Sequence, residues 1–149
     1  MTIRVVNGPN LALLGKREPE VYGRETLADI VAAAERRAAA LGATIEAFQS
    51  DIEGELVGYI GRSRGAADGL IVNAGAYTHT SVAIRDAIAA SGLPCVEVHL
   101  SNVLKRETFR HQSYLGPVCV GLIMGFGGYG YELAIDALAR HIGAARKDR

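Results

Sequence analysis

The chain has 149 residues, of which 49% are apolar, and its formal net charge is zero. This length and composition suffice for one substantial core, so a single domain over residues 1–149 is predicted. The 16 basic residues form no long run, which argues against a nucleic-acid or anionic-membrane partner and favours a small-molecule ligand. No apolar stretch is long enough for a membrane helix and no signal-peptide pattern precedes the first strand, so a cytoplasmic protein is expected.

The two cysteines, Cys95 and Cys119, each lie in an apolar run that predicts a strand. Buried thiols in a reducing compartment fit this placement better than a disulfide framework does. The sequence alone leaves a bridge between them open.

A long loop follows the first predicted strand, Ile3–Val6. Residues 7–23 show neither helical nor alternating periodicity, and loops of this length usually serve as lids or binding loops. This loop contains Asn10, Arg17 and Tyr22. A guanidinium about 4 Å from a tyrosine supplies the roughly 4 kcal/mol that makes a phenolate base at neutral pH. The loop by itself favours the simpler interpretation, in which Tyr22 packs on a neighbour and Arg17 is a solvated charge.

Strands and helices alternate along the rest of the chain. Helical spacing over residues 26–41, with Thr26 and Asp29 as a capping box and Gly42 at the end, predicts the first long helix. Ser50 and Glu53 form a second capping box, which predicts a helix through Ile60. The remaining predicted elements are strands at 44–48, 69–73, 94–98 and 118–124, helices at 81–90 and 105–111, a last helix burying Tyr131, Ala134, Ile135, Leu138 and Ile142, and a polar tail at 144–149.

Near-continuous apolar strands that alternate with helices are typical of a parallel sheet covered on both faces. The predicted fold class is therefore α/β, a flavodoxin-like doubly wound five-stranded parallel sheet with strand order 2-1-3-4-5. Ligands of such sheets bind beyond the carboxyl ends of the strands, beside strands one and three. Polar residues gather after the predicted strands at 7–22, 73–80 and 97–102.

Glu97 and His99 are two residues apart near a strand end, so their side chains project from the same face. A carboxylate beside an imidazole fixes the tautomer of the ring and favours its protonated form, as a general acid requires. The pair is a weak signal by itself. The alternative is a solvated surface pair, and its position at the carboxyl end of a strand argues against that.

The residues that follow predict an anion site. Backbone N–H groups of Leu100 and its successors, together with the Ser101 hydroxyl, stand ahead of a short helix and suit a carboxylate or phosphate. Helix capping by Ser101 or Asn102 is an equal alternative. Arg106 and Arg110 are one helical turn apart and can face the same anion, although such charges are more often solvated. From the polar loop after the third strand, Asn73 and His79 are singled out.

Three familiar motifs are absent or incomplete. Gly125–Gly130 has the dinucleotide spacing, but the chain ends with the following helix, so the second strand and the acidic ribose contact are missing. Gly15-Lys16-Arg17 lacks the Ser or Thr and the glycine of a phosphate-binding loop. No Cys/His cluster has the spacing of a metal site.

Taken together, the polar segments resemble type II 3-dehydroquinate dehydratase over nearly the whole chain. Several long motifs occur in the same order, which makes a specific match. Two departures are Ala12, where the family often has a polar residue, and Asp51, where it often has Asn; they bear at most on loop rigidity. The matching segments are residues 7–11, 14–19, 22–23, 48–54, 73–86, 97–102, 106–111, 125–127 and 130–131.

The resemblance implies a trans-elimination of water from 3-dehydroquinate to 3-dehydroshikimate through an enolate, without metal or cofactor. By this analogy Tyr22 removes the C2 proton, Arg17 keeps Tyr22 basic, and Asn10 with a water stabilises the enolate. His99, oriented by Glu97, protonates the departing hydroxyl. The reaction belongs to the shikimate pathway and aromatic amino-acid biosynthesis, and quinate breakdown uses it too, so the sequence leaves both roles open.

The same resemblance implies how substrate is held and how subunits assemble. Ser101 and the Leu100 amide would bind the substrate carboxylate. A homododecamer built from four trimers is expected, in which Asp86 reaches the site of a neighbouring subunit. The residues expected to bind the substrate hydroxyls are Asn73, His79 and Arg110.

Two other classes fit parts of the sequence. A non-catalytic flavin-binding module explains the fold and the glycine loop, but not the combination of Tyr22, Arg17 and the Glu97–His99 pair. A hydrolase of a phosphorylated or carboxylated small molecule lacks a Ser or Cys in a nucleophile elbow. The dehydratase is therefore the preferred interpretation.

Overall fold

A parallel sheet forms the centre of the computed structural model, which describes residues 1–16, 18–22 and 24–149, with the backbone alone of Val21 and Tyr22. Within the described residues, one five-stranded sheet has the order β2-β1-β3-β4-β5, as the sequence predicts. All neighbouring strands pair in parallel. The strands are β1 (Thr2–Asn7), β2 (Thr44–Gln49), β3 (Gly69–Asn73), β4 (Cys95–His99) and β5 (Gly121–Met124).

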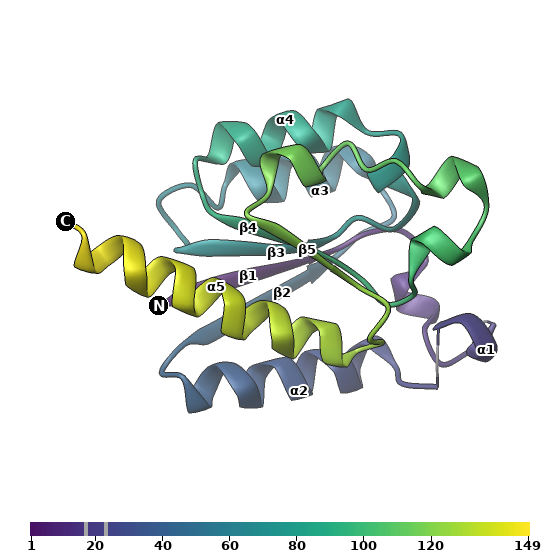
Figure 1. Cartoon of the computed structure of the whole chain (residues 1–149), viewed down its shortest axis with the longest axis horizontal. Coiled ribbons are helices and arrows are strands. Elements are labelled where there is room, and N and C mark those ends of the chain that lie inside the picture. Colours follow the sequence, from purple (N-terminus) through teal and green to yellow (C-terminus); the bar gives the residue numbers. More distant parts are fainter. Residues whose placement is uncertain (17, 23) are drawn as a thin grey trace.

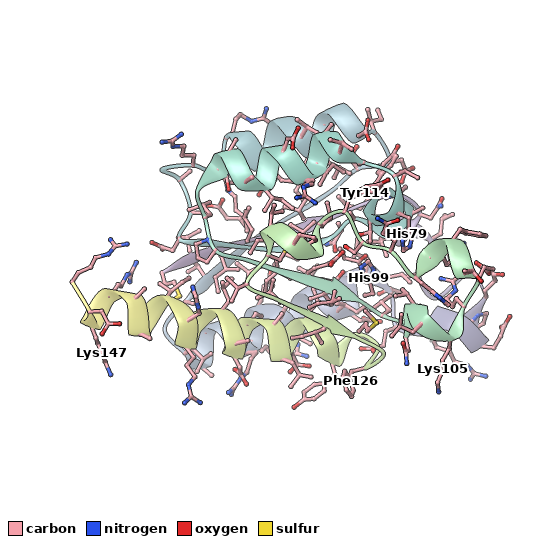
Figure 2. All side chains as sticks on the ribbon, turned by 45° about the horizontal axis from the view of Figure 1, so that its top comes forward. His79, His99, Lys105, Tyr114, Phe126 and Lys147 are labelled. Atoms are coloured by element: carbon pink, nitrogen blue, oxygen red, sulfur yellow. The ribbon has the colours of Figure 1, made fainter. Side chains whose placement is uncertain are left out.

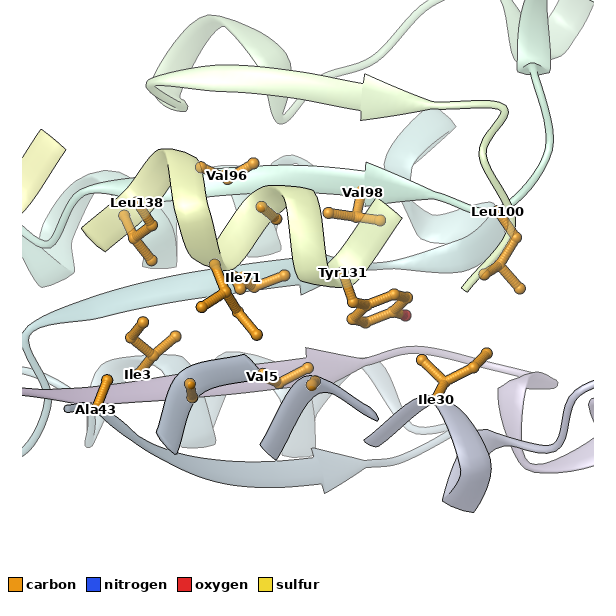
Figure 3. Close-up of a cluster of buried hydrophobic side chains, with 14 of the residues drawn as sticks. Ile3, Val5, Ile30, Ala43, Ile71, Val96, Val98, Leu100, Tyr131 and Leu138 are labelled. Atoms are coloured by element: carbon orange, nitrogen blue, oxygen red, sulfur yellow. The ribbon is translucent and has the colours of Figure 1, made fainter. Parts of the chain in front are cut away.

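Two pairs of helices cover the two faces of the sheet (Figure 1). Helices α2 (Leu27–Ala40) and α5 (Tyr129–Lys147) pack on one face, and α3 (Glu53–Gly61) and α4 (Val82–Ser91) pack on the other. Because both faces are covered, the central strands β3 and β4 are buried along their whole length. Figure 3 shows the core beneath α2 and α5, where Tyr131 lies among aliphatic side chains near the carboxyl ends of the strands.

Local signals predicted several helix boundaries correctly. The Thr26 side chain accepts from the Asp29 amide and Asp29 accepts from the Thr26 amide, so the first capping box is present. Gly42 has a φ of 72° just after α2. The Ser81 hydroxyl caps α4 at the Ile84 amide. The core face predicted for the last helix is buried from Tyr131 to Ile142.

The prediction of a second capping box, from Ser50 and Glu53, is wrong. Helix α3 begins at Glu53, its N-cap position is Ile52, and no side chain caps it. The Ser50 hydroxyl instead accepts from the Ile52 amide and donates to Glu55. The chain needs a turn between Ser50 and the helix because β2 ends at Gln49 on the edge of the sheet, and this turn displaces the serine from the cap.

Two other predicted boundaries also change. The fifth strand begins at Gly121, because residues 116–118 form a 3-10 turn around Pro117, and Cys119 therefore precedes the sheet. Cys95 is buried and Cys119 is half-buried, and both are free thiols. Helix α5 continues to Lys147 through the expected polar tail, whose alanines and basic residues favour a helix C-terminus.

The polar segments after β1 and β4 contain short turns. The expected helix at 105–111 is instead two 3-10 turns, η3 (Val103–Lys105) and η4 (Thr108–Arg110). Arg106 and Glu107 separate them, and Arg106 is in an extended conformation. The long loop after β1 holds the 3-10 turn η1 (Leu11–Leu13) and the one-turn helix α1 (Pro19–Tyr22). In the part of the chain that the structure describes, no helix is both long enough and apolar enough to span a membrane.

Candidate active site

A pocket, whose empty space together with its open mouth is about 740 Å³, opens beyond the carboxyl ends of β1, β3 and β4. This is the location predicted for a doubly wound sheet. Its walls combine an apolar rim with hydrogen-bonding groups and two arginines, as in sites that orient a small polar ligand. The pocket is lined by Pro9, Asn10, Leu11, Leu13, Leu14, Asn73, Gly75, Ala76, His79, His99, Leu100, Ser101, Val103, Arg106 and Arg110.

Asn10 enters this pocket in a left-handed backbone conformation, with a φ of 67°. Asparagine tolerates that region better than most residues, and such conformations are frequent at functional sites. The Asp51 carboxylate accepts from the Asn10 amide at 3.0 Å and from Gln49 Nε2 at 3.1 Å. Asp51, one of the two departures from the family pattern, therefore holds the backbone of Asn10 in place.

The Glu97–His99 pair is buried rather than solvated. Glu97 is fully buried, His99 is 6% exposed, and His99 Nε2 lies 3.1 Å from Glu97 Oε1. Burial by itself raises the pKa of Glu97, but hydrogen bonds from His99, Ser113 and Thr78 and the charge of His99 outweigh it and hold that pKa below its ordinary value. An ionised Glu97 occupies Nε2, so Nδ1 is the ring nitrogen left to exchange a proton.

Two hydroxyl groups that were not predicted as site residues complete this pair. Thr78 Oγ1 donates to Glu97 Oε1 at 3.1 Å, and Ser113 Oγ donates to both carboxylate oxygens, at 2.7 and 2.9 Å. Thr78 lies in the 3-10 turn η2 (Gly75–His79), in the polar loop after β3, but nothing in its local pattern distinguishes it from a cap. Ser113 lies 16 residues beyond Glu97 in an irregular segment, where the sequence carries no signal for it.

A buried tyrosine orients Asn73 in the floor of the pocket. The Tyr131 hydroxyl donates to Asn7 Oδ1 at 2.6 Å and accepts from Asn73 Nδ2 at 3.0 Å. Burial raises the pKa of Tyr131 well above its usual value, so the phenol stays neutral. Asn73 Oδ1 accepts from the Gly75 amide. The second hydrogen of Asn73 Nδ2 remains to face a ligand.

The residues predicted to form an anion site after β4 line the same pocket. Asn102, not Ser101, caps the following turn, since its side chain accepts from the Leu104 amide. Ser101 and Leu100 line the pocket, and neither side chain caps that turn. Arg106 and Arg110 both line it too, although they belong to separate turns rather than to one helix. Arg110 is also paired with Glu107.

His79 lines the pocket near His99. Its Nδ1 is 2.8 Å from the Gln112 carbonyl oxygen, so it donates there and leaves Nε2 for a ligand. The rings of His79 and His99 lie nearly parallel, with centroids 6.4 Å apart. Figure 2 shows both histidines in the same part of the molecule, on the side away from Lys147.

Seven of the eleven predicted site residues line the pocket, and Glu97 lies directly beneath it. Asp86 was expected to serve the site of a neighbouring subunit; it is exposed on α4 and does not line this pocket, and the single chain does not test that role. Arg17 and the Tyr22 side chain lie outside the described residues, so the structure does not test their predicted roles. The seven are Asn10, Asn73, His79, His99, Leu100, Ser101 and Arg110.

Comparison with known proteins identifies the family. The sequence profile described as dehydroquinase class II matches residues 1–139. A 3-dehydroquinate dehydratase of Jannaschia sp. is 57% identical over 142 residues, which are 95% of this chain and 96% of that protein. A catabolic 3-dehydroquinase of Aspergillus clavatus is 53% identical over 138 residues, 93% of this chain and 92% of that protein.

A solved structure agrees with these sequence matches. The type II dehydroquinase of Butyrivibrio crossotus superposes with a TM-score of 0.90 at 45% sequence identity, covering 93% of this chain and 97% of that one. Fold and sequence therefore point the same way. The chain belongs to the class II dehydroquinase family.

Proposed function

We propose that the pocket beyond β1, β3 and β4 dehydrates 3-dehydroquinate to 3-dehydroshikimate, the hydro-lyase reaction of the family, with no metal or cofactor. The buried Glu97–His99 pair is the observation that carries this proposal, because it supplies a positioned proton carrier beside an anion-binding wall. Elimination of water needs such a group, since hydroxide is a poor leaving group until it is protonated.

The proposed chemistry begins at the loop after β1. Tyr22, kept ionised by Arg17, removes a proton from C2 of the substrate, and the electrons move onto the adjacent carbonyl to form an enolate. Asn10, held by Asp51, is placed in the pocket where a hydrogen bond to the enolate oxygen, through a water, would stabilise it. The enolate then expels the hydroxyl group, which His99 protonates as it leaves.

The pocket wall suits the rest of the substrate. Ser101 and the Leu100 amide are proposed to bind the carboxylate, with the positive charges of Arg106 and Arg110 favouring an anionic ligand. Asn73, whose amide Tyr131 orients, is proposed to bind the hydroxyls. His79 and Arg110 complete that set.

Two wider features are part of the same proposal. The exposed Asp86 of one subunit is proposed to complete the site of its neighbour in a homododecamer, a tetramer of trimers. The enzyme is proposed to act in the cytoplasm, in the shikimate pathway of aromatic amino-acid biosynthesis. Enzymes of quinate breakdown catalyse the same reaction, and growth of a deletion strain on quinate or without aromatic amino acids separates the two roles.

An ultraviolet assay for the conjugated enone product tests the function. Wild-type protein in the presence of EDTA should produce enone from 3-dehydroquinate. Tyr22→Phe and His99→Ala should each lower kcat by about 10²- to 10⁴-fold with a smaller effect on KM, because they act mainly in the transition state. The matched controls Tyr129→Phe and His141→Ala change exposed side chains of α5 and should keep wild-type turnover. Near-normal turnover in either site variant would contradict the role given to that residue.

A further inference from the structure

Glu97 keeps its charge in the interior without a strong cation beside it. Among the described residues its ion pair is with His99 alone, and its side chain is fully buried. A buried carboxylate is stable only when donors satisfy its oxygens. The donors besides His99 are the hydroxyls of Thr78 and Ser113, and Ser113 contacts both oxygens. The charge of Glu97 therefore depends on these two neutral hydroxyl groups as well as on His99.

The Ser113 hydroxyl has only one way to use its proton. Its oxygen accepts from the Leu115 amide at 3.1 Å and from the Gly116 amide at 3.0 Å. A serine hydroxyl has two acceptor positions and one hydrogen, so with both acceptor positions filled the hydrogen points at Glu97. Two amide donors also polarise the hydroxyl and strengthen the bond that it gives. Ser113 can thus serve a carboxylate, but has no lone pair left to accept from a protonated Glu97.

The segment around Ser113 is fastened to the pocket on both sides. The Gln112 carbonyl accepts from His79, and the Tyr114 amide donates to the Thr78 carbonyl at 2.9 Å. Residues 112–114 are therefore tied to η2 through the neighbours of Ser113 on both sides, and the Ser113 hydroxyl is held at the carboxylate. Figure 2 shows Tyr114 and His79, which mark this part of the molecule. The hydrogen bond between Ser113 and Glu97 is therefore held in place by the backbone contacts of residues 112 and 114.

We propose that Ser113, assisted by Thr78, is a positioning residue that holds Glu97 ionised and aimed at His99 Nε2, and thereby sets how readily His99 releases its proton to the leaving hydroxyl. The inference rests on the proton-donor role proposed above for His99. Ser113 does not line the pocket, so it acts on the reaction only through Glu97.

Loss of the Ser113 hydroxyl should change the proton affinity of the Glu97–His99 pair in a definite direction. The hydroxyl stabilises the doubly deprotonated pair, with Glu97 charged and His99 neutral, more than the pair that still carries a proton. Removing it raises the proton affinity of the pair, so His99 keeps its proton to higher pH and becomes a weaker acid. The other titratable or charged groups around the pair are His79 from η2, Cys95 on the same strand, and Arg106 and Arg110 across the pocket. None of them is replaced.

The test compares Ser113→Ala with Ser91→Ala in the full-length enzyme. Ser91 is a matched control. Like the Ser113 hydroxyl, its hydroxyl accepts from the amide two residues further along the chain. Unlike Ser113, Ser91 is buried in α4 and donates to a backbone carbonyl, not to a carboxylate. Ser113→Ala should lower kcat at least about tenfold, while KM changes less than about threefold. This loss is a part of the rate enhancement of about 10²- to 10⁴-fold that proton transfer by a positioned side chain supplies. The basic limb of its pH–rate profile should move to higher pH. Ser91→Ala should change neither.

A double-mutant cycle separates positioning from structural support. In a Glu97→Gln background there is no carboxylate to hold, so Ser113→Ala should cause no further loss of kcat. An equal loss in both backgrounds would overturn the proposal. Thr78→Val, which removes the other hydroxyl from a different element, should shift the basic limb in the same direction, and this variant decides the matter if Ser113→Ala does not fold.

A readout independent of turnover distinguishes this inference from the proposed function. NMR titration of ¹³C-labelled histidine rings follows His99 directly. Its midpoint should rise in Ser113→Ala and stay at the wild-type value in Ser91→Ala. An unchanged midpoint in Ser113→Ala would overturn the role of Ser113 whatever the enzyme acts on. Absence of turnover with 3-dehydroquinate, together with a shifted midpoint, would overturn only the proposed function.

Discussion

Glu97 is fully buried and yet keeps its charge. Its folded pKa lies below the ordinary value of 4.5. A carboxylate with a lowered folded pKa contributes stability that is complete above its unfolded pKa and is lost as the pH falls through the folded one. Its hydrogen-bonded burial thus couples the site to acid stability.

The corresponding prediction concerns unfolding between about pH 5 and pH 3, the range around and below an ordinary carboxyl pKa. The difference in unfolding free energy between the wild type and Glu97→Gln should become smaller as the pH falls. The reason is that Glu97 loses its stabilising charge when it is protonated, whereas glutamine does not titrate. Urea titrations at several pH values measure it. Glu35→Gln, an exposed change on α2, is the control. A difference that stays constant with pH would contradict the lowered pKa.

The lysines bear on the type of chemistry. Lys16, Lys105 and Lys147 are all exposed, and Figure 2 shows the last two at opposite ends of the molecule. A lysine that forms an imine needs a depressed pKa, which burial supplies. None of the three has such surroundings.

We therefore predict a reaction without an imine. Borohydride added together with 3-dehydroquinate should leave activity unchanged after dialysis, because there is no Schiff base to reduce. Activity before and after treatment, and the intact mass of the protein, are the measurements. Irreversible inactivation with substrate mass added at a lysine would refute this prediction.

At the scale of elements, the loop after β1 depends on a close approach to β3. The Gly8 amide donates to the Asn73 carbonyl at 2.7 Å. A Cβ at Gly8 would lie 2.4 Å from the Ala74 carbonyl oxygen and 2.6 Å from its carbon, which are backbone atoms that cannot rotate away. Glycine is therefore required where the two strand ends meet, next to Asn10 and Asn73.

Gly8→Ala should lower the unfolding free energy by about 1–3 kcal/mol, as overpacking typically does, and reduce kcat because the pocket floor shifts. Gly61→Ala is the matched control: Gly61 ends α3 with nothing within 4 Å of its would-be Cβ, so the change should raise helix stability by up to about 1 kcal/mol. The midpoints of urea unfolding and the kcat values of the two variants test this prediction. Equal stability of Gly8→Ala and wild type would contradict the required approach.

At the scale of the whole molecule, the exposed Asp86 raises the question of shared sites. Helix α4 buries Ile84 and Ile88 and leaves Asp86 exposed. A contact to a neighbouring site requires a closed ring in which every subunit both gives and receives it. This arrangement makes complementation between two inactive variants possible.

Asp86→Ala and Tyr22→Phe, each weak alone, should regain activity when they are unfolded and refolded together. Some mixed rings then combine Tyr22 of one subunit with Asp86 of another. Tyr22→Phe mixed with His99→Ala is the control, and it should stay inactive because both residues are proposed to serve the same subunit's site. Turnover of the mixtures and their assembly state by sedimentation are measured. Mixed assemblies without regained activity, or an active wild-type monomer, would rule out a shared site.

Sequence pattern was sufficient where the physics is local. The capping box at Thr26, the glycine after α2 and the buried face of α5 follow from neighbours a few residues apart, and the alternation of elements led to the observed sheet order. Glu97 and His99 were also predicted to act together, because residues two apart on a strand share a face.

The tertiary structure decided what depends on contacts between distant segments. Tyr131 reaches Asn7 across 124 positions, and Asp51 holds Asn10 across 41, so neither partner is visible in a local pattern. The displaced Ser50 and the late start of β5 show the same limit, since the path of the chain into the sheet overrode a capping signal and an apolar run. Ser113 is the clearest case: a serine in an irregular segment becomes a committed donor only because the fold brings a buried carboxylate and two backbone amides to its hydroxyl.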